Sequence, residues 1–117
     1  MDLSKIENDL ISEIKLTPLQ AKIFLFITTQ GKQTIKQISE KFNLTESEAL
    51  EITNSLIAIG SLIDLSKTEF EAMHPRFTAV NMYRRMCERE KIEFKRNKIV
   101  DSIGVLLEKP YDNARTK

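Results

Sequence analysis

The fold of this chain is indicated most strongly by residues 34–73, TIKQISEKFNLTESEALEITNSLIAIGSLIDLSKTEFEAM. It contains two Thr-x-x-Gln/Glu signatures, Thr34 with Gln37 and Thr45 with Glu48. In each signature the threonine hydroxyl and the side chain three residues later can satisfy two backbone amides at the start of a helix. The stretch therefore predicts two short helices whose first residues are set by local chemistry.

The same signature stands upstream, where Thr17 pairs with Gln20 and Pro18 fills the first helical position. Proline is favoured there because its φ is already helical and its missing N–H is not needed. We expect a helix over residues 18–30, ended by Gly31. A further amphipathic helix is predicted over residues 3–15, because apolar side chains recur at steps of three and four.

Downstream of the second signature, Gly60 is a glycine stop, and two short apolar stretches follow at 62–65 and 70–73. They predict a β-hairpin. Two capped helices, a stop and a hairpin are the order of a winged helix-turn-helix, a module that usually places its second helix in the DNA major groove. The predicted fold is thus mainly α with a small β-hairpin wing, a recognition helix at 45–59 and a wing at 62–73.

Helical periodicity separates the two faces of the recognition helix. At 100° per residue, Ala49, Ile52, Leu56 and Ile59 share the core face, and the opposite face would meet DNA. Cations near this helix in sequence would contact phosphates. The predicted DNA-binding residues are Lys36, Thr45, Glu46, Ser47, Glu51, Asn54, Lys67 and Arg76.

After the wing, the apolar residues of positions 77–109 form two displaced stripes. One straight helix cannot bury both stripes against one partner, so this region is either a long helix that also packs on a second copy or a broken helix. We expect a DNA-binding domain at 1–76, a carboxy-terminal helical dimerisation region at 77–109 and a polar tail at 110–117. The predicted homodimer interface comprises Leu3, Ile6, Leu10, Ile92, Ile99, Ile103 and Leu106.

The charges behind the net value of +1 are unevenly distributed, and the basic residues are concentrated in one stripe. Residues 76–98 contain eight Lys or Arg against three Glu, a net charge of +5. Such a stripe is typical of a phosphate-contacting surface, and equally of a solvated helix face laced with ion pairs.

Catalytic and metal-binding constellations are missing from the sequence. One histidine and one cysteine cannot supply a nucleophile–base pair or a metal ligand set, so we expect no enzyme activity, no cofactor and no metal. Cys87 and His74 are expected to be a packing residue and a satisfied hydrogen-bonding residue. A lone cysteine without a signal peptide or an apolar span predicts a cytoplasmic protein.

The segment LTPLQAKIFL at residues 16–25 resembles the Leu-Thr-x-x-Glu-Ala-Lys-Val-Tyr opening of the TrmB-like archaeal transcription regulators. The segment at 35–44, followed by Leu56, Gly60 and Leu62, resembles that family's helix-turn-helix and wing entry. The resemblance covers residues 1 to about 80 and implies a dimeric regulator that binds double-stranded DNA. Full-length members append a large effector-binding domain, which 117 residues cannot contain.

Members of that family usually carry Arg or Lys near the start of the recognition helix, where this chain has Glu46, Glu48 and Glu51. Carboxylates oppose phosphate binding, although Glu51 can accept a hydrogen bond from a cytosine amino group. Two hypotheses follow. The first is a sequence-specific, homodimeric transcriptional regulator. The alternative is a winged-helix module whose acidic helix binds a protein. The operator, any small-molecule or protein effector, and the direction of regulation are not encoded in these patterns.

Overall fold

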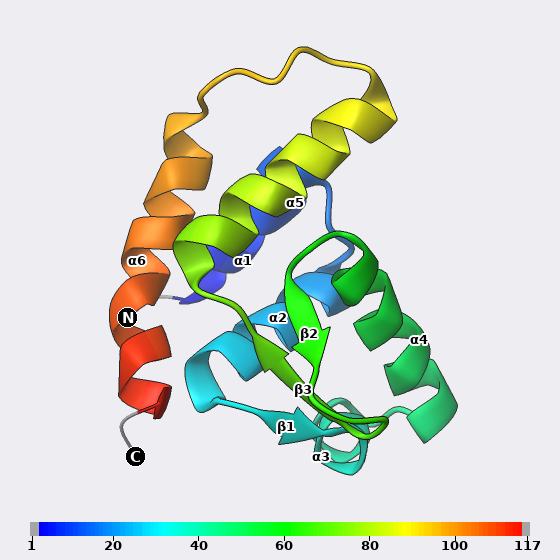
Figure 1. Cartoon of the computed structure of the whole chain (residues 1–117). Helices are drawn as coiled ribbons and strands as arrows, with labels where there is room; N and C mark the ends of the chain where they lie inside the picture. Colours follow the sequence, from blue (N-terminus) through cyan, green and yellow to red (C-terminus); the bar gives the residue numbers. More distant parts are fainter. Residues whose placement is uncertain (1–2, 116–117) are drawn as a thin grey trace.

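The computed structural model describes residues 3–115, and it is mainly helical with a small antiparallel sheet (Figure 1). The helices are α1 (Leu3–Ile14), α2 (Pro18–Gln30), α3 (Ile35–Phe42), α4 (Glu46–Ala58), α5 (Pro75–Glu90) and α6 (Lys98–Arg115). The strands are β1 (Gln33–Thr34), β2 (Leu62–Asp64) and β3 (Glu69–Ala72). The arrangement is compatible with a winged-helix-like fold.

Each of the three threonine signatures forms a closed capping box. At α4, the Thr45 N–H donates to Glu48 Oε1 over 2.9 Å, and the Glu48 N–H donates to Thr45 Oγ1 over 3.0 Å. The boxes that begin at Thr17 and Thr34 contain the same pair of bonds. The three predicted helix starts are therefore confirmed.

The predicted hairpin is confirmed, and it belongs to a sheet with one more strand. β3 is the central strand of the order β1–β3–β2, with Leu62 opposite Ala72 and Gln33 opposite Phe70. β1 was not predicted from the sequence because it is only two residues long and ends on the threonine that caps α3. The Ile35 N–H also donates to the Thr68 carbonyl over 2.7 Å, which ties the start of α3 to the hairpin turn.

The core is centred on α2, which packs against α1, α4, α6 and β3. Phe24 of α2 and Phe70 of β3 are the largest fully buried side chains, and Ile23, Ile27 and Leu56 lie among them. Burying these side chains from three elements in one cluster removes a large apolar area from water, which is the main favourable term in folding.

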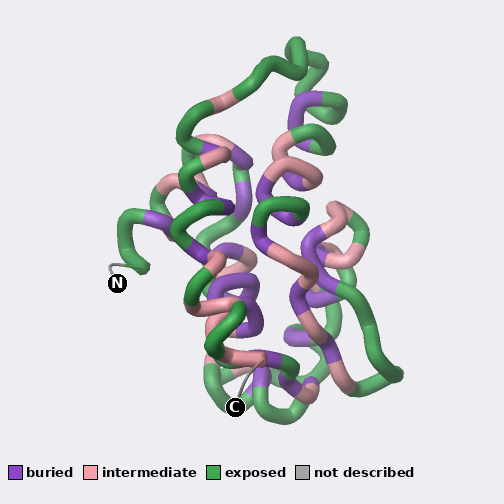
Figure 2. The backbone as a smooth tube through the Cα atoms, turned by 60° about the vertical axis from the view of Figure 1, so that its left-hand side comes forward, coloured by how far each residue is buried: buried purple, intermediate pink, exposed green. Residues whose placement is uncertain are grey.

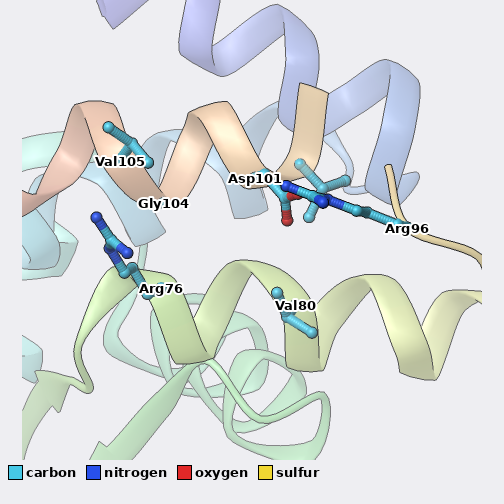
Figure 3. A pocket seen from close by; sticks show the side chains of 7 residues that line it. Arg76, Val80, Arg96, Asp101, Gly104 and Val105 are labelled. Atoms are coloured by element: carbon cyan, nitrogen blue, oxygen red, sulfur yellow. The ribbon is translucent and has the colours of Figure 1, made fainter. Parts of the chain in front are cut away.

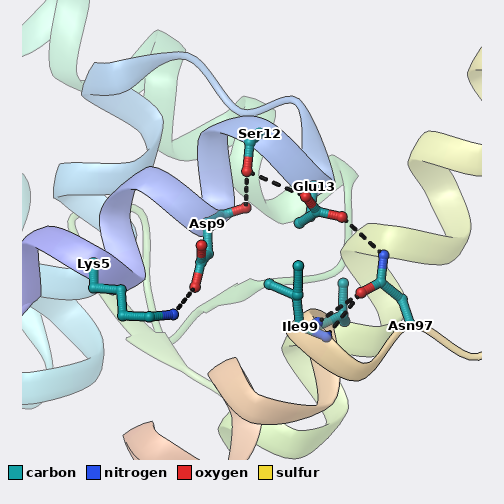
Figure 4. A network of polar contacts seen from close by, with 7 residues as sticks. Lys5, Asp9, Ser12, Glu13, Asn97 and Ile99 are labelled. Atoms are coloured by element: carbon teal, nitrogen blue, oxygen red, sulfur yellow. Dashed lines mark hydrogen bonds and ion pairs between the residues drawn. The ribbon is translucent and has the colours of Figure 1, made fainter.

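The carboxy-terminal region is a broken helix, which was one of the two predicted forms. α5 ends at Glu90 and is capped by Lys91, whose φ of 56° places it in the left-handed region, and the Ile92 N–H donates to the Cys87 carbonyl. α6 begins where Asn97 Oδ1 accepts the N–H groups of Ile99 and Val100. Asn97 also donates from Nδ2 to Glu13 Oε1 of α1 over 3.0 Å, so a tertiary contact fixes this helix start (Figure 4).

The predicted polar tail is wrong, because α6 continues through Pro110 to Arg115. Proline lacks the N–H that would bond the preceding turn, so the last turn needs other support. Arg115 supplies it by donating to the Ala72 carbonyl over 3.0 Å and pairing with Glu71 at 3.3 Å, while its guanidinium lies 3.5 Å from the centre of the Tyr111 ring. The remainder of the predicted tail, 116–117, lies outside the described residues.

The predicted dimer interface is wrong at Ile6, Leu10 and Ile103. Each is at most 1% exposed within a single chain, because α6 packs against α1 and α2. These side chains belong to the protomer's own core. The four other residues of the predicted set are exposed.

Candidate nucleic-acid interface

The start of α3, the amino-terminal end of α4 and the hairpin turn lie at one end of the molecule (Figure 1). Lys36 is exposed on the first turn of α3, Thr45 and Glu46 begin α4, and Lys67 is exposed in the turn between β2 and β3. The hydrogen bond from the Ile35 N–H to the Thr68 carbonyl joins the start of α3 to the hairpin turn. The structure thus brings most of the predicted DNA-binding residues to one end of the fold.

The outer face of α4 has the predicted composition. Ser47, Glu51 and Asn54 are exposed, while Ala49 and Leu56 on the opposite face are buried. Leu50 was missed by the sequence prediction, although it lies three residues after Ser47 and four before Asn54 and therefore shares their face. Its side chain is 39% exposed, which places an apolar group in the middle of the polar face.

The electrostatic character of α4 is acidic. The helix contains three glutamates and no Lys or Arg. Within the described residues, Glu46 and Glu51 form no ion pair, whereas Glu48 completes the capping box. The Thr45 backbone N–H, and secondarily its hydroxyl, hold the pKa of Glu48 below its ordinary value. The carboxylates of Glu46 and Glu51 are therefore exposed, with no ion-pair partner among residues 3–115.

Arg76 does not belong to this surface, which corrects its predicted place. Its guanidinium pairs with Glu108 of α6 and borders a hollow of about 330 Å³ between α5 and α6 (Figure 3). Gly104 lines that hollow at a point where α6 approaches the backbone of α5. Arg76 was assigned to the interface because it lies close to the wing in the sequence.

The rest of the basic stripe lies at the end of the molecule opposite the amino terminus of α4, around the loop that joins α5 to α6 (Figure 1). Part of the basic stripe is a solvated face with local ion pairs, which was one of the two interpretations of the sequence. These pairs are Arg89 with Glu90, Lys95 with Glu93, and Arg96 with Asp101. Arg85 instead donates to the Ala58 carbonyl at the carboxy-terminal end of α4 over 3.1 Å.

The two residues with reactive side chains have structural roles. His74 caps α5 by accepting the Arg76 N–H at Nδ1 over 3.2 Å, and its ring lies against Tyr111. Cys87 is buried in the last turns of α5. Both predictions are confirmed. Among residues 3–115 no group of histidine, cysteine or carboxylate side chains could hold a metal ion.

No described helix is both long enough and apolar enough to cross a bilayer. Comparisons with protein-family models, with curated proteins and with solved structures give no match to this chain.

Proposed function

We propose that this chain is a DNA-binding transcriptional regulator of the winged helix-turn-helix type. The supporting observation is that α3, the amino-terminal end of α4 and the hairpin turn lie together at one end of the fold, joined by the Ile35–Thr68 backbone bond. A recognition helix and a wing need this placement to contact one duplex together. The resemblance of residues 16–25 and 35–44 to the TrmB-like regulators favours the same function.

In this function the phosphate contacts come from Lys36 at the start of α3 and Lys67 in the hairpin turn, which are both exposed. Base edges are read from α4, where Asn54 can bond adenine and Glu51 can accept from cytosine. Because α4 itself has no cation, non-specific affinity is low and the two lysines carry most of it. Glu46 and Glu51 then act mainly by lowering the affinity for DNA sequences other than the operator.

The regulator acts as a homodimer in the cytoplasm. Ile99 and Leu106 lie seven residues apart on the outer face of α6, and both are exposed, as is Val105 beside them. An exposed apolar helix face of this kind suits a two-fold contact with the same face of a second copy. Such a dimer would present two recognition helices to two half-sites of an operator.

A second candidate function is favoured by a specific observation. The exposed face of α4 combines acidic side chains with Leu50 and has no Lys or Arg, and most of the basic stripe lies at the other end of the fold. A face of that composition suits a basic protein surface better than phosphates. In this alternative the chain is a winged-helix interaction module.

Binding to random duplex DNA as a function of salt separates the two candidates. We expect measurable binding at about 50 mM salt and a salt slope that falls by about one unit for each lost phosphate contact in Lys36→Gln and Lys67→Gln. A control with Lys15→Gln and Lys109→Gln removes the same charge from exposed positions outside α3, α4 and the hairpin turn.

Two outcomes overturn the regulator proposal. One is negligible duplex binding by the wild type at about 50 mM salt, where electrostatic affinity is strong. The other is an equal loss in the control and test variants, since binding would then depend on overall charge and not on this surface.

A further inference from the structure

The loop between α5 and α6 forms a surface with an apolar centre and a basic rim. Ile92 and Phe94 are 51% and 48% exposed. We call this surface the basic tip; its cations are Arg84, Arg89, Lys91, Lys95, Arg96 and Lys98. Its exposed loop stands at the top of the molecule in two views (Figures 1 and 2). Lys91 and Lys98 form no ion pair within the described residues.

The outer face of α4 has the same layout with the opposite charge. Exposed Leu50 stands between Glu46 and Glu51, whose carboxylates face solvent without an ion-pair partner in the described part of the chain. We call these three residues the acidic face. Protein interfaces commonly combine an apolar centre with a charged rim, and opposite rims guide the two partners into register.

We propose that the basic tip docks on the acidic face of a second copy of this chain. The amino-terminal end of α4 lies away from the α5–α6 loop in Figure 1, so the two surfaces are separated within a protomer. They can therefore contact each other only when they belong to different copies. Each copy then offers one surface of each kind, and the contact is head-to-tail. A contact of this type extends along a row of molecules or closes into a ring, depending on the rotation between neighbouring copies.

The charges favour this occupant over nucleic acid at the tip. A phosphate backbone would complement the cations but would leave Ile92 and Phe94 against a hydrated strand. The acidic face offers both carboxylates and Leu50, so it complements the rim and the centre together. Because the charged groups are exposed, the association is weak and decreases as salt screens them.

The docking itself does not depend on DNA binding, but one consequence rests on the proposed function. The acidic face is part of the proposed recognition helix, so a docked tip and a duplex compete for the same residues. Head-to-tail association then covers α4 when DNA is absent, and DNA binding releases the neighbouring copy.

A charge-swap experiment on the full chain tests the proposal. The first variant carries Glu46→Lys and Glu51→Lys, and the second carries Lys91→Glu and Lys98→Glu. None of the four side chains forms an ion pair in the described structure, so both variants should fold, and circular dichroism checks this. A control with Lys32→Glu and Lys109→Glu makes the same change of charge as the second variant, at exposed positions that belong to neither surface.

Average mass by sedimentation is measured at about 50 mM and about 500 mM salt, since the higher concentration screens charge pairs and leaves apolar contacts in place. We expect the wild type and the control to gain mass beyond that of the proposed α6 dimer only at low salt. Each test variant alone should show at least about a tenfold weaker association, because two attractions become repulsions. An equimolar mixture of the two variants should recover it, because each reversed surface then meets one of opposite sign.

Failure of the mixture to recover the association would overturn the proposal, and so would a wild type whose mass is independent of salt. If the second variant loses duplex affinity while its self-association is unchanged, the tip binds nucleic acid and the proposal is wrong. Duplex binding by the wild type is scored separately, so failure of the regulator proposal and failure of head-to-tail docking are distinguishable.

Discussion

The α3–α4 pair and the α5–α6 pair each join two helices through a connection without regular structure, yet their boundaries have different origins. α3 and α4 begin at Thr34 and Thr45, and each cap is completed by a side chain three residues later. α6 begins at Asn97, which is held by Glu13 from the other end of the sequence. The first pair is defined locally, while the second depends on the assembled core.

That difference predicts that α6 will tolerate substitution only on its outer face. Ile103 is 1% exposed within the chain, whereas Leu106, three residues later, is exposed. Ile103→Glu should cost more than about 3 kcal/mol of unfolding free energy, because it buries a carboxylate without a partner. Leu106→Glu should cost less than about 1 kcal/mol and act on dimerisation instead. Urea denaturation and sedimentation measure the two effects, and equal destabilisation would contradict the assignment of faces.

The close approach of α5 and α6 provides the next test. A Cβ on Gly104 would lie 3.1 Å from the Arg76 Cα and 3.4 Å from the Pro75 carbonyl oxygen. Gly104→Ala should therefore destabilise the chain by about 1 kcal/mol, since overpacking outweighs the helix propensity gained. Ser102→Ala, on an exposed position of the same helix, should be neutral or slightly stabilising. Thermal unfolding that shows both substitutions to be stabilising would mean that the two helices separate readily.

Double-mutant cycles can measure whether each helix cap depends on a local or a distant partner. Asn97→Ala and Thr34→Ala should each cost about 1 kcal/mol, the usual value for a lost cap. The partners should differ: Asn97→Ala should couple to Glu13→Ala by about 0.5 kcal/mol or more, and Thr34→Ala to Gln37→Ala. Coupling between Thr34 and Glu13 would show that the local and tertiary caps are not independent.

The smallest expected effect is a pH dependence at the local cap of α4. The pKa of Glu48 is below its ordinary value, so its charged form stabilises the folded state. This contribution is present above the unfolded pKa and is lost as pH falls through the lower folded pKa. Glu48→Gln should keep the box, as Gln20 and Gln37 do in the other two, and should remove that acid sensitivity. The stability gap between the two proteins at about pH 6 and about pH 3 measures it, and an unchanged gap would contradict the assignment.

The contrast between local and tertiary helix boundaries explains which parts of the fold could be predicted from the sequence. Helix starts and ends that depend on local chemistry, such as Thr17, Thr34 and Gly60, were predicted correctly because their partners lie within a turn of the chain. β1 was missed because two residues carry no periodicity. The helix end expected at Pro110 was wrong because Arg115 holds the last turn through contacts with β3.

The candidate site shows the same limit. The exposed residues of α4 follow from helical geometry alone, and Leu50 could have been found in the same way. Arg76 was misplaced because its ion-pair partner, Glu108, lies far along the sequence. Ile103 was assigned to a second copy because an apolar stripe shows that a helix has a partner, without showing whether the partner is the same chain.

The contact of Arg115 with β3 also makes the last turn of α6 a useful place for a reporter. Asp112 is exposed on that turn, and Arg115 holds the turn on the central strand of the wing. A fluorophore attached to a cysteine at position 112 would sense displacement of β3 while standing outside the proposed contact surfaces, and Cys87 is buried and shielded from the label. Movements of the wing could then be followed in real time with the whole of α4 unmodified.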